Sequence, residues 1–362
     1  MFELKENFID FYFDINKLNK NFDDFEKIGR VYYPLKTNSN EIVLEYLLPM
    51  ISRGENGFLI SHLSHYYKLI KMGVKPNRMC LINVLAEGEL IKMLYENGVR
   101  YFTFDNLEIL DRFSKYADLN ETKIAVRLSI TEVFKDKFSH LGGGADECKK
   151  MLSFLKGKCE DYGISFYLQR EIFSNNNSLN EMLDFIYDNF IGYNMTFLNI
   201  GGAKKPEEID VQRIEDIKRQ LNIDTIIIEP GRYLVGNCVD METRITKISN
   251  IQNRKTVIVK NGIYSGFVDI LLYSKKFEIY FQTNNKDKVL LSYEKTEECD
   301  YEFFICGGSS DSGDRFGSFF INSKYKDEII VGAKFYIKDV GAYFEEFFMP
   351  LGGDLIKKYN II

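Results

Sequence analysis

Residues 30–61 read RVYYPLKTNSNEIVLEYLLPMISRGENGFLIS and contain the unit that organises most of this chain. The stretch opens with a short β-rich run at residues 30–38 and closes with a strand-like run at residues 57–61. Between them, residues 40–54 carry apolar side chains at helical spacing and end at a glycine. The pattern predicts a strand, a helix and a second strand, from which parallel sheets are built.

The same alternation extends from about residue 25 to residue 245. Helices are predicted at HLSHYYKLIKMG (62–73) and AEGELIKMLYENG (86–98), and further strands at RMCLIN (78–83), RYFTFD (100–105), TKIAVRLSI (122–130), ISFYLQ (164–169), MTFLNIGG (195–202) and DTIIIEPG (224–231). Each strand-like run is short and continuously apolar, as expected for strands buried on both faces. Eight such runs favour a (β/α)8 barrel of the TIM type, with a doubly wound open sheet as the alternative.

After about residue 245 the sequence is typical of an all-β region. Strands are predicted at TRITKISNIQ (243–252), KTVIVKNGIYSGFVDILLY (255–273), KFEIYFQT (276–283), KVLLSYE (288–294), CDYEFFICGG (299–308) and AKFYIKDVGAYF (333–344). We therefore expect two domains. Residues 25–245 form the barrel, and residues 1–24 together with 246–362 form a β-barrel or β-sandwich.

The composition of the 362 residues is that of an ordinary globular protein, with 45% hydrophobic and 28% charged residues. The formal net charge of −6 and the lack of a Lys/Arg-rich run argue against a nucleic-acid partner. Six scattered cysteines without a CxxC pair indicate reduced thiols, and three histidines make a zinc site, or any other metal site, unexpected. The N-terminal segment is charged throughout and lacks the apolar stretch of a signal peptide, and no apolar run is long enough to cross a membrane. We therefore expect a cytoplasmic protein without a signal peptide and without a membrane partner.

Lys36 is the first candidate for a catalytic role, because it stands where the first predicted barrel strand ends. Catalytic groups of such barrels lie at these strand ends. By itself, a lysine here is more simply a side chain that extends its ammonium into water. An apolar setting disfavours the charged form, however, and so favours a nucleophilic amine.

Three further segments carry unusual residues at predicted strand ends or in β-region loops. Gly201–Gly202 is either a simple turn or a place where backbone N–H groups approach an anion. Glu229 and Arg232 bracket a Pro-Gly turn and are either a structural ion pair or site residues. The loop GGSSDSGD (307–314), which contains two aspartates, is a turn, a source of metal ligands or a ligand loop.

Taken in order, these segments resemble a known family over nearly the whole chain. The motifs that carry the resemblance are FYFDINKL (11–18), YYPLKTNSN (32–40), AVRLSI (125–130), FLNIGGA (197–203), EPGR (229–232), GGSSDSGD (307–314) and GAYFEEFFMPLGG (341–353). They are similar to motifs of the alanine-racemase-fold (fold type III) decarboxylases that depend on pyridoxal 5′-phosphate (PLP). This family includes ornithine, diaminopimelate, lysine and carboxynorspermidine decarboxylases.

The resemblance implies the following roles. Lys36 is expected to hold PLP as a Schiff base, and Glu229 to pair with its pyridine nitrogen. Phosphate donors are expected at Gly201, Gly202, Gly231, Arg232 and Tyr343, with further cofactor contacts from Arg127, Tyr167 and Arg170. Ser310 is expected at the proton-donor position, and Tyr264, Ser274 and Asp311 at the substrate. The family also implies a homodimer in which the loop with Ser310 and Asp311 serves the other subunit's site.

The substrate side departs from the family pattern. Ser310 stands in place of the cysteine that reprotonates the product, and a hydroxyl is a much weaker acid than a thiol. Ser274 replaces one of the two acids that bind the distal amine of ornithine, whereas Asp311 keeps the other. We expect decarboxylation of an amino acid with a distal amine or polar group, as in polyamine precursors. Decarboxylation coupled to transamination, racemisation and a non-catalytic regulatory role are the alternatives.

Overall fold

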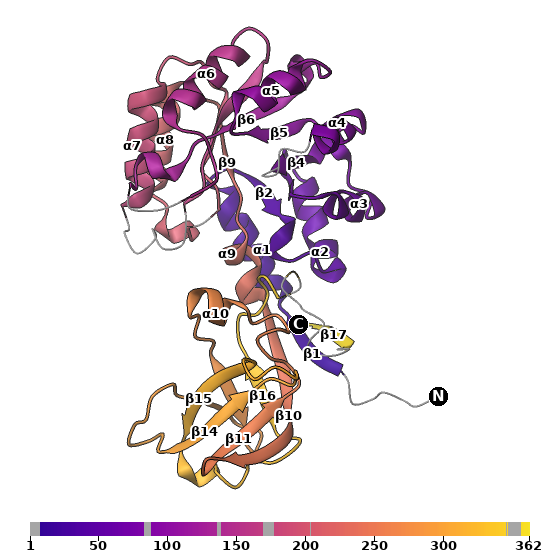
Figure 1. Cartoon of the computed structure of the whole chain (residues 1–362), viewed down its shortest axis with the longest axis vertical. Coiled ribbons are helices and arrows are strands. Elements are labelled where there is room, and N and C mark those ends of the chain that lie inside the picture. Colours follow the sequence, from indigo (N-terminus) through magenta and orange to yellow (C-terminus); the bar gives the residue numbers. More distant parts are fainter. Residues whose placement is uncertain are drawn as a thin grey trace. The chain divides into compact units, whose positions relative to one another are not determined.

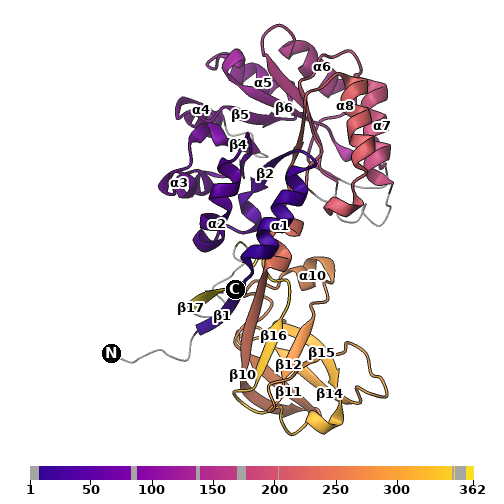
Figure 2. The same cartoon turned by 180° about the vertical axis from the view of Figure 1, so that it is seen from behind.

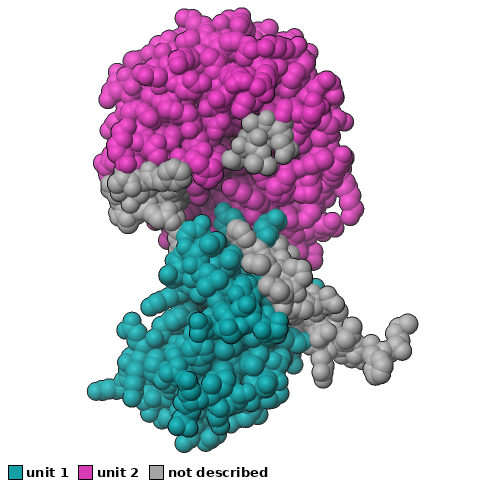
Figure 3. All heavy atoms as spheres, in the orientation of Figure 1, with its two compact units in different colours: residues 1–18, 234–362 teal, residues 19–233 magenta. Residues whose placement is uncertain are grey.

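The computed structural model describes residues 8–82, 88–135, 139–168, 177–202, 204–344, 346 and 356–362. The chain divides into two compact units, residues 19–233 and residues 1–18 with 234–362 (Figure 3). This division differs from the expected boundaries at residues 25 and 245. Most of the first helix falls in the barrel unit, whereas the long strand that begins at Val239 falls in the other unit.

The unit of residues 19–233 contains a closed barrel of eight parallel strands, which confirms the predicted fold class. The strands are β2 (Arg30–Pro34), β3 (Gly57–Ile60), β4 (Met79–Ile82), β5 (Tyr101–Phe104), β6 (Lys123–Arg127), β7 (Asp161–Ser165), β8 (Phe197–Asn199) and β9 (Thr225–Ile228). Pairing of Val31 in β2 with Ile228 in β9 closes the ring, which excludes the open-sheet alternative.

Helices surround this barrel on the outside (Figures 1 and 2). They are α1 (Ile15–Glu26), α2 (Glu41–Ser52), α3 (Leu63–Lys71), α4 (Gly88–Glu96), α5 (Leu107–Ser114), α6 (Ala145–Leu155), α7 (Ser178–Phe190), α8 (Val211–Leu221) and α9 (Arg232–Val235), with 3-10 turns η1 (Leu35–Thr37), η2 (Pro76–Arg78), η3 (Leu119–Glu121), η4 (Ile130–Glu132) and η6 (Pro206–Glu208). Side chains from seven strands form a buried cluster that includes Tyr32, Tyr101 and Phe197. The inside of the barrel is therefore filled with packed side chains, and functional residues are expected at the strand ends.

The other unit contains one mixed sheet of nine strands. These are β1 (Phe8–Phe13), β10 (Val239–Ile251), β11 (Arg254–Val259), β12 (Ile279–Gln282), β13 (Lys288–Leu290), β14 (Tyr301–Cys306), β15 (Arg315–Ile321), β16 (Lys334–Ile337) and β17 (Ile356–Ile361). Seven strands follow the order β13-β12-β16-β10-β11-β14-β15, and β1 pairs with both β10 and β17. A bridge between Ser292, just after β13, and Phe320 in β15 makes the sheet curl on itself.

One detail of this unit corrects the sequence expectation. The predicted strand at residues 255–273 ends at Val259, and its second half forms a turn and the short helix α10 (Asp269–Tyr273). The 3-10 turns η7 (Gly236–Cys238) and η8 (Ser323–Tyr325) complete the unit. Across the described ranges, no helix has both the length and the apolar character that a membrane span requires. No group of three or more potential metal ligands occurs in the same ranges.

Candidate active site

Lys36 is the middle residue of η1, the single turn that directly follows β2. Its neighbours Leu35 and Thr37 are buried, so they anchor the turn, whereas solvent reaches Lys36. The surrounding protein nevertheless removes water from the ammonium group and lowers the pKa of Lys36, while Glu229 raises it and Arg127 lowers it. A lysine whose neutral amine is favoured in this way can act as a nucleophile toward a carbonyl group.

Glu229 follows β9 and lies within electrostatic reach of both Lys36 and Arg127. Loss of water around the carboxyl raises the pKa of Glu229, whereas the hydrogen bond from Asn199 and the charges of Arg127 and Lys36 lower it. Arg127 is the last residue of β6. The structure thus gathers two cationic side chains and one carboxylate at the carboxyl ends of three barrel strands.

Asn199, the last residue of β8, connects Glu229 to the glycine pair. Its Nδ2 donates to Glu229 Oε1 at 2.6 Å, and its Oδ1 accepts a hydrogen bond from the Gly201 N–H at 3.0 Å. The amide also donates to the Tyr101 hydroxyl at 3.3 Å, inside the barrel. Asn199 is 1% exposed, so a buried amide holds the Glu229 carboxylate in place. Asn199 is not among the site residues predicted from the sequence; its signal is a polar residue at an inward-facing strand position two residues before Gly201.

The glycines lie where other side chains would collide with neighbouring backbone. Gly201 has φ +70°, and a Cβ there would stand 2.7 Å from the Phe166 carbonyl oxygen. A Cβ at Gly202 would overlap the carbonyl of Glu229, and one at Gly231 would overlap the Thr37 hydroxyl. The loops after β8 and β9 and the turn after β2 therefore pack backbone against backbone. Such closely approaching backbone can present N–H groups to an anion.

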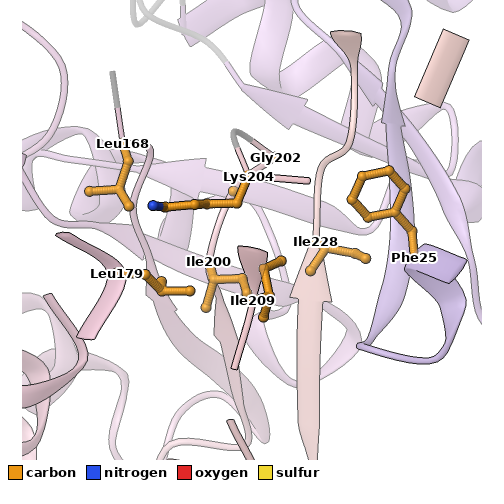
Figure 4. Close-up of a pocket in the computed structure, with 9 residues that line it drawn as sticks. Phe25, Leu168, Leu179, Ile200, Gly202, Lys204, Ile209 and Ile228 are labelled. Atoms are coloured by element: carbon orange, nitrogen blue, oxygen red, sulfur yellow. The ribbon is translucent and has the colours of Figure 1, made fainter. Parts of the chain in front are cut away.

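We call the backbone at Gly201, Gly202 and Gly231 the cradle. One aromatic candidate, Tyr167, and one cationic candidate, Arg232, flank it. Tyr167, two residues after β7, is 41% exposed, and its Cδ2 would stand 3.4 Å from a Cβ at Gly201. Arg232 is the first residue of α9 and is half-buried. Arg170 lies outside the described residues. A small pocket beside the cradle contains buried Lys204, whose side chain extends toward Leu168 (Figure 4).

The remaining sequence candidates lie in the β unit. Tyr264 donates its hydroxyl hydrogen to Asp311 Oδ1 at 3.1 Å, and this hydrogen bond raises the pKa of Tyr264. Ser310 and Asp311 are neighbours on the exposed loop between β14 and β15. Ser274 caps α10 in the left-handed conformation, with φ 50°, and is exposed. Tyr343 is half-buried, with φ 66°.

The structure therefore brings the candidates together as two sets, one in each unit. Lys36, Arg127, Glu229 and the glycines form the set at the barrel strand ends, and Tyr264 with Asp311 is the centre of the other set.

Known proteins that are similar in sequence to this chain include several decarboxylases. Residues 13–149 match the family model described as the pyridoxal binding domain of pyridoxal-dependent decarboxylases. The diaminopimelate decarboxylase of Helicobacter pylori is 24% identical, over 96% of this chain and 86% of that protein. Antizyme inhibitor 2 of Xenopus laevis is also 24% identical, over 65% of this chain and 57% of its own length.

Among solved structures, the arginine decarboxylase of Paramecium bursaria Chlorella virus bound to agmatine has the same fold. The two structures superpose with a TM-score of 0.77 at 18% identity, covering 98% of this chain and 96% of the viral one. Both the barrel and the β unit are thus shared with a decarboxylase.

Proposed function

Because the chain belongs to the fold type III family of PLP-dependent decarboxylases, we propose that it removes the α-carboxylate of an amino acid that carries a distal amine or another polar group. The observation that carries this proposal is the set of side chains at the barrel strand ends. There, a lysine with a lowered pKa lies within the electrostatic reach of a carboxylate that a buried amide holds in place.

The residues of this set fit the cofactor in three respects. At Gly201, Gly202 and Gly231 the loops after β8 and β9 and the turn after β2 pack backbone closely together, and backbone of this kind can present N–H groups to a phosphate. Glu229 offers a carboxylate to a pyridine nitrogen, and Lys36 offers an amine to an aldehyde. When bound, PLP supplies an electron sink for the electrons released as CO2 leaves.

The protein's own residues would divide the remaining work. Lys36 would hold the cofactor covalently through Nζ, and Arg127, Tyr167, Arg170, Arg232 and Tyr343 would contact its ring or phosphate. Asn199 would hold Glu229 in place. Ser310 would stand at the proton-donor position, and Tyr264, Ser274 and Asp311 would contact the substrate.

The names of the relatives support the substrate class. Diaminopimelate and arginine, the substrates that two of the names indicate, are amino acids with a second nitrogen-containing group at the far end. An exposed carboxylate such as Asp311 is suited to a distal cation. We further propose a homodimer in which the loop of residues 307–314 completes the site of the partner copy.

The cofactor assignment is tested by reduction with borohydride and peptide mapping. After incubation with PLP, we expect a pyridoxyl group on the peptide that contains Lys36, and its loss in Lys36→Ala. Lys36→Ala should also abolish CO2 release from every amino acid that the wild type accepts, while circular dichroism shows a folded chain. A wild-type chain with no label on Lys36 would overturn the proposal.

The similarity to antizyme inhibitor 2 favours a second candidate, a regulator that binds a protein partner without catalysis. A chain that takes up no PLP label and releases no CO2 from a panel of amino acids would support it. Other PLP chemistry is tested by turnover in deuterated water. An amine with one deuterium at the former α-carbon indicates simple decarboxylation, whereas a carbonyl product or racemised substrate indicates the alternatives.

A further inference from the structure

We propose that Asp314 is a positioning residue that, together with Tyr264, sets the carboxylate of Asp311 for the distal cation of the substrate. The inference rests on the proposed function and goes beyond it, because Asp314 touches neither cofactor nor substrate in that proposal. It acts by fastening two loops of the β unit, residues 261–266 and residues 307–314, to each other.

Asp314 is a carboxylate that is almost completely enclosed, with 3% of its surface exposed. Its Oδ1 accepts the Ile263 N–H at 2.6 Å, and its Oδ2 accepts the Ser309 N–H at 3.1 Å. The two donors belong to different loops, so one side chain ties both backbones together. Hydrogen bonds to a carboxylate are among the stronger ones, and they are least easily replaced when the group is buried.

Glycines on both sides leave room for the carboxylate of Asp314. A Cβ at Gly262 or at Gly307 would overlap the carboxylate of Asp314. The backbone of Asp314 also takes part, since Gly307 N–H donates to its carbonyl at 2.8 Å, and its own N–H donates to the Asp311 carbonyl at 3.1 Å. The loop is therefore closed around Asp314 by main-chain bonds as well as by the side chain.

Asp311 lies on the solvent side of the same loop and is held by the groups that Asp314 fixes. Its Oδ1 accepts the Gly313 N–H at 2.6 Å and the Tyr264 hydroxyl at 3.1 Å. Tyr264 follows Ile263, whose N–H is bonded to Asp314. A shift of either loop would therefore separate Tyr264 from Asp311.

This arrangement gives Asp311 a defined orientation in an exposed position. Both hydrogen bonds to the Asp311 side chain end on Oδ1, and no ion pair neutralises Asp311 among the residues that the structure describes. Oδ2 remains available to an amine. An orientation fixed beforehand lowers the entropic cost of binding such a cation.

The test separates orientation from general stability by using ligands that differ only in the distal amine. With PLP-loaded protein, the dissociation constants of 1,5-diaminopentane and 1-aminopentane are measured by calorimetry, and kcat and KM are measured for L-lysine and L-norleucine. In Asp314→Asn, the side-chain amide can replace only one of the two acceptors and presents N–H to the other donor. We expect the diamine to lose about tenfold in affinity, while the monoamine changes less than about twofold.

Two further variants complete the design. Tyr264→Phe removes one hydrogen bond to Asp311 without disturbing Asp314. It should therefore shift the ratio of the diamine and monoamine dissociation constants in the same direction. This variant is the one to measure if Asp314→Asn does not fold. Asp300→Asn is the matched control. It removes an exposed Asp side chain in the same unit that accepts the Ser323 N–H at 2.8 Å, and it should leave the ratio unchanged.

The outcomes distinguish this inference from the proposed function. If Lys36 takes up no cofactor, the proposed function fails. If Lys36 is labelled but the wild type binds both amines equally, or if both ligands weaken in parallel in Asp314→Asn and Tyr264→Phe, Asp314 has only a structural role and the inference is wrong. A loss of affinity for the diamine but not for the monoamine, together with a raised KM for L-lysine, supports the inference.

Discussion

The charges of Lys36, Glu229 and Arg127 control one another at the residue scale. The surrounding protein favours the neutral forms of Lys36 and Glu229, whereas the attraction between them favours the charged forms. Arg127 adds a positive charge that stabilises the carboxylate and disfavours the ammonium. The three residues thus tune how readily the amine at Lys36 loses its proton.

This coupling makes a prediction about the pH dependence of cofactor attachment. Only the unprotonated amine attacks an aldehyde, so the rate of PLP attachment to apo-protein should rise with pH through the lowered pKa of Lys36. Glu229→Gln removes the charge that raises this pKa, so the midpoint should move to lower pH. Arg127→Met removes a charge that lowers it, so the midpoint should move to higher pH.

Absorbance of the adduct, followed in stopped flow between neutral and alkaline pH, reports the midpoint. Lys36→Ala gives the background from surface lysines. The midpoint is compared instead of the amplitude, because Arg127 and Glu229 are also proposed cofactor contacts. Midpoints that move together in both variants would contradict the opposite signs of the two charges.

Individual site residues differ in how well the sequence predicts them. Lys36 and Glu229 stand at the ends of recognisable strands, so a family motif and strand position together single them out. The contributions of Asn199 and Asp314 depend on which backbone groups come within hydrogen-bond distance. For Asp314 these are the N–H groups of Ile263 and Ser309, which belong to two separate loops, and local sequence carries no record of that proximity.

At the scale of elements, the loops after β8 and β9 form a single packed feature. Gly202 lies against the carbonyl of Glu229, and the Glu229 N–H donates to the Gly201 carbonyl at 2.9 Å. The cradle and the carboxylate are thus joined through backbone as well as through Asn199. A disturbance in one loop should reach the other.

Gly202→Ala tests this contact. The added methyl group would have to displace the Glu229 backbone, and overpacking of this kind costs about 1–3 kcal/mol of unfolding free energy. We expect that loss in urea unfolding, together with weaker PLP binding in a fluorescence titration. Gly88→Ala is the matched control, because a Cβ at Gly88 meets open space at the start of α4. A Gly202→Ala protein with wild-type stability and PLP affinity would show that the two loops are not tightly coupled.

The barrel elements were more predictable than those of the β unit. Eight short apolar runs, the first three of them each followed by a helical pattern, lead to a closed parallel barrel because parallel strands need such connections. In the β unit, residues 263–273 are as apolar as a strand but form a turn and helix α10, since Gly262 and Gly266 interrupt the extended backbone there. Neither β15 nor β17 is predicted from the sequence. The partner of β17 is β1, at the other end of the chain, whereas β15 pairs with β14 directly before it, across the loop of residues 307–314.

At the scale of the whole molecule, the two sets of candidate residues raise the question of how many chains build one site. Under the proposed homodimer, Lys36 from one copy and Asp311 from the other serve the same substrate. Mixing inactive Lys36→Ala with inactive Asp311→Ala under conditions that allow subunits to exchange should then restore about a quarter of wild-type activity, because half of the dimers are mixed and each has one intact site.

Sedimentation of the mixture confirms that dimers are present, and each variant alone supplies the baseline. A mixture that stays as inactive as its components, despite exchange of fluorescently labelled subunits, would show that each site is built within one chain. It would also show that Asp311 serves its own barrel.

The pairing of β1 with β17 has a consequence for the order in which the protein can fold during its synthesis. Each neighbouring pair of strands from β2 to β9 is joined by one connection, and all of them emerge from the ribosome before β10 begins. The strand β1 is made first, yet its partners β10 and β17 are made after the whole barrel, with β17 the later of the two. The barrel can therefore form while β1 still presents unpaired backbone N–H and carbonyl groups, which makes the nascent chain most prone to wrong pairing at its oldest strand.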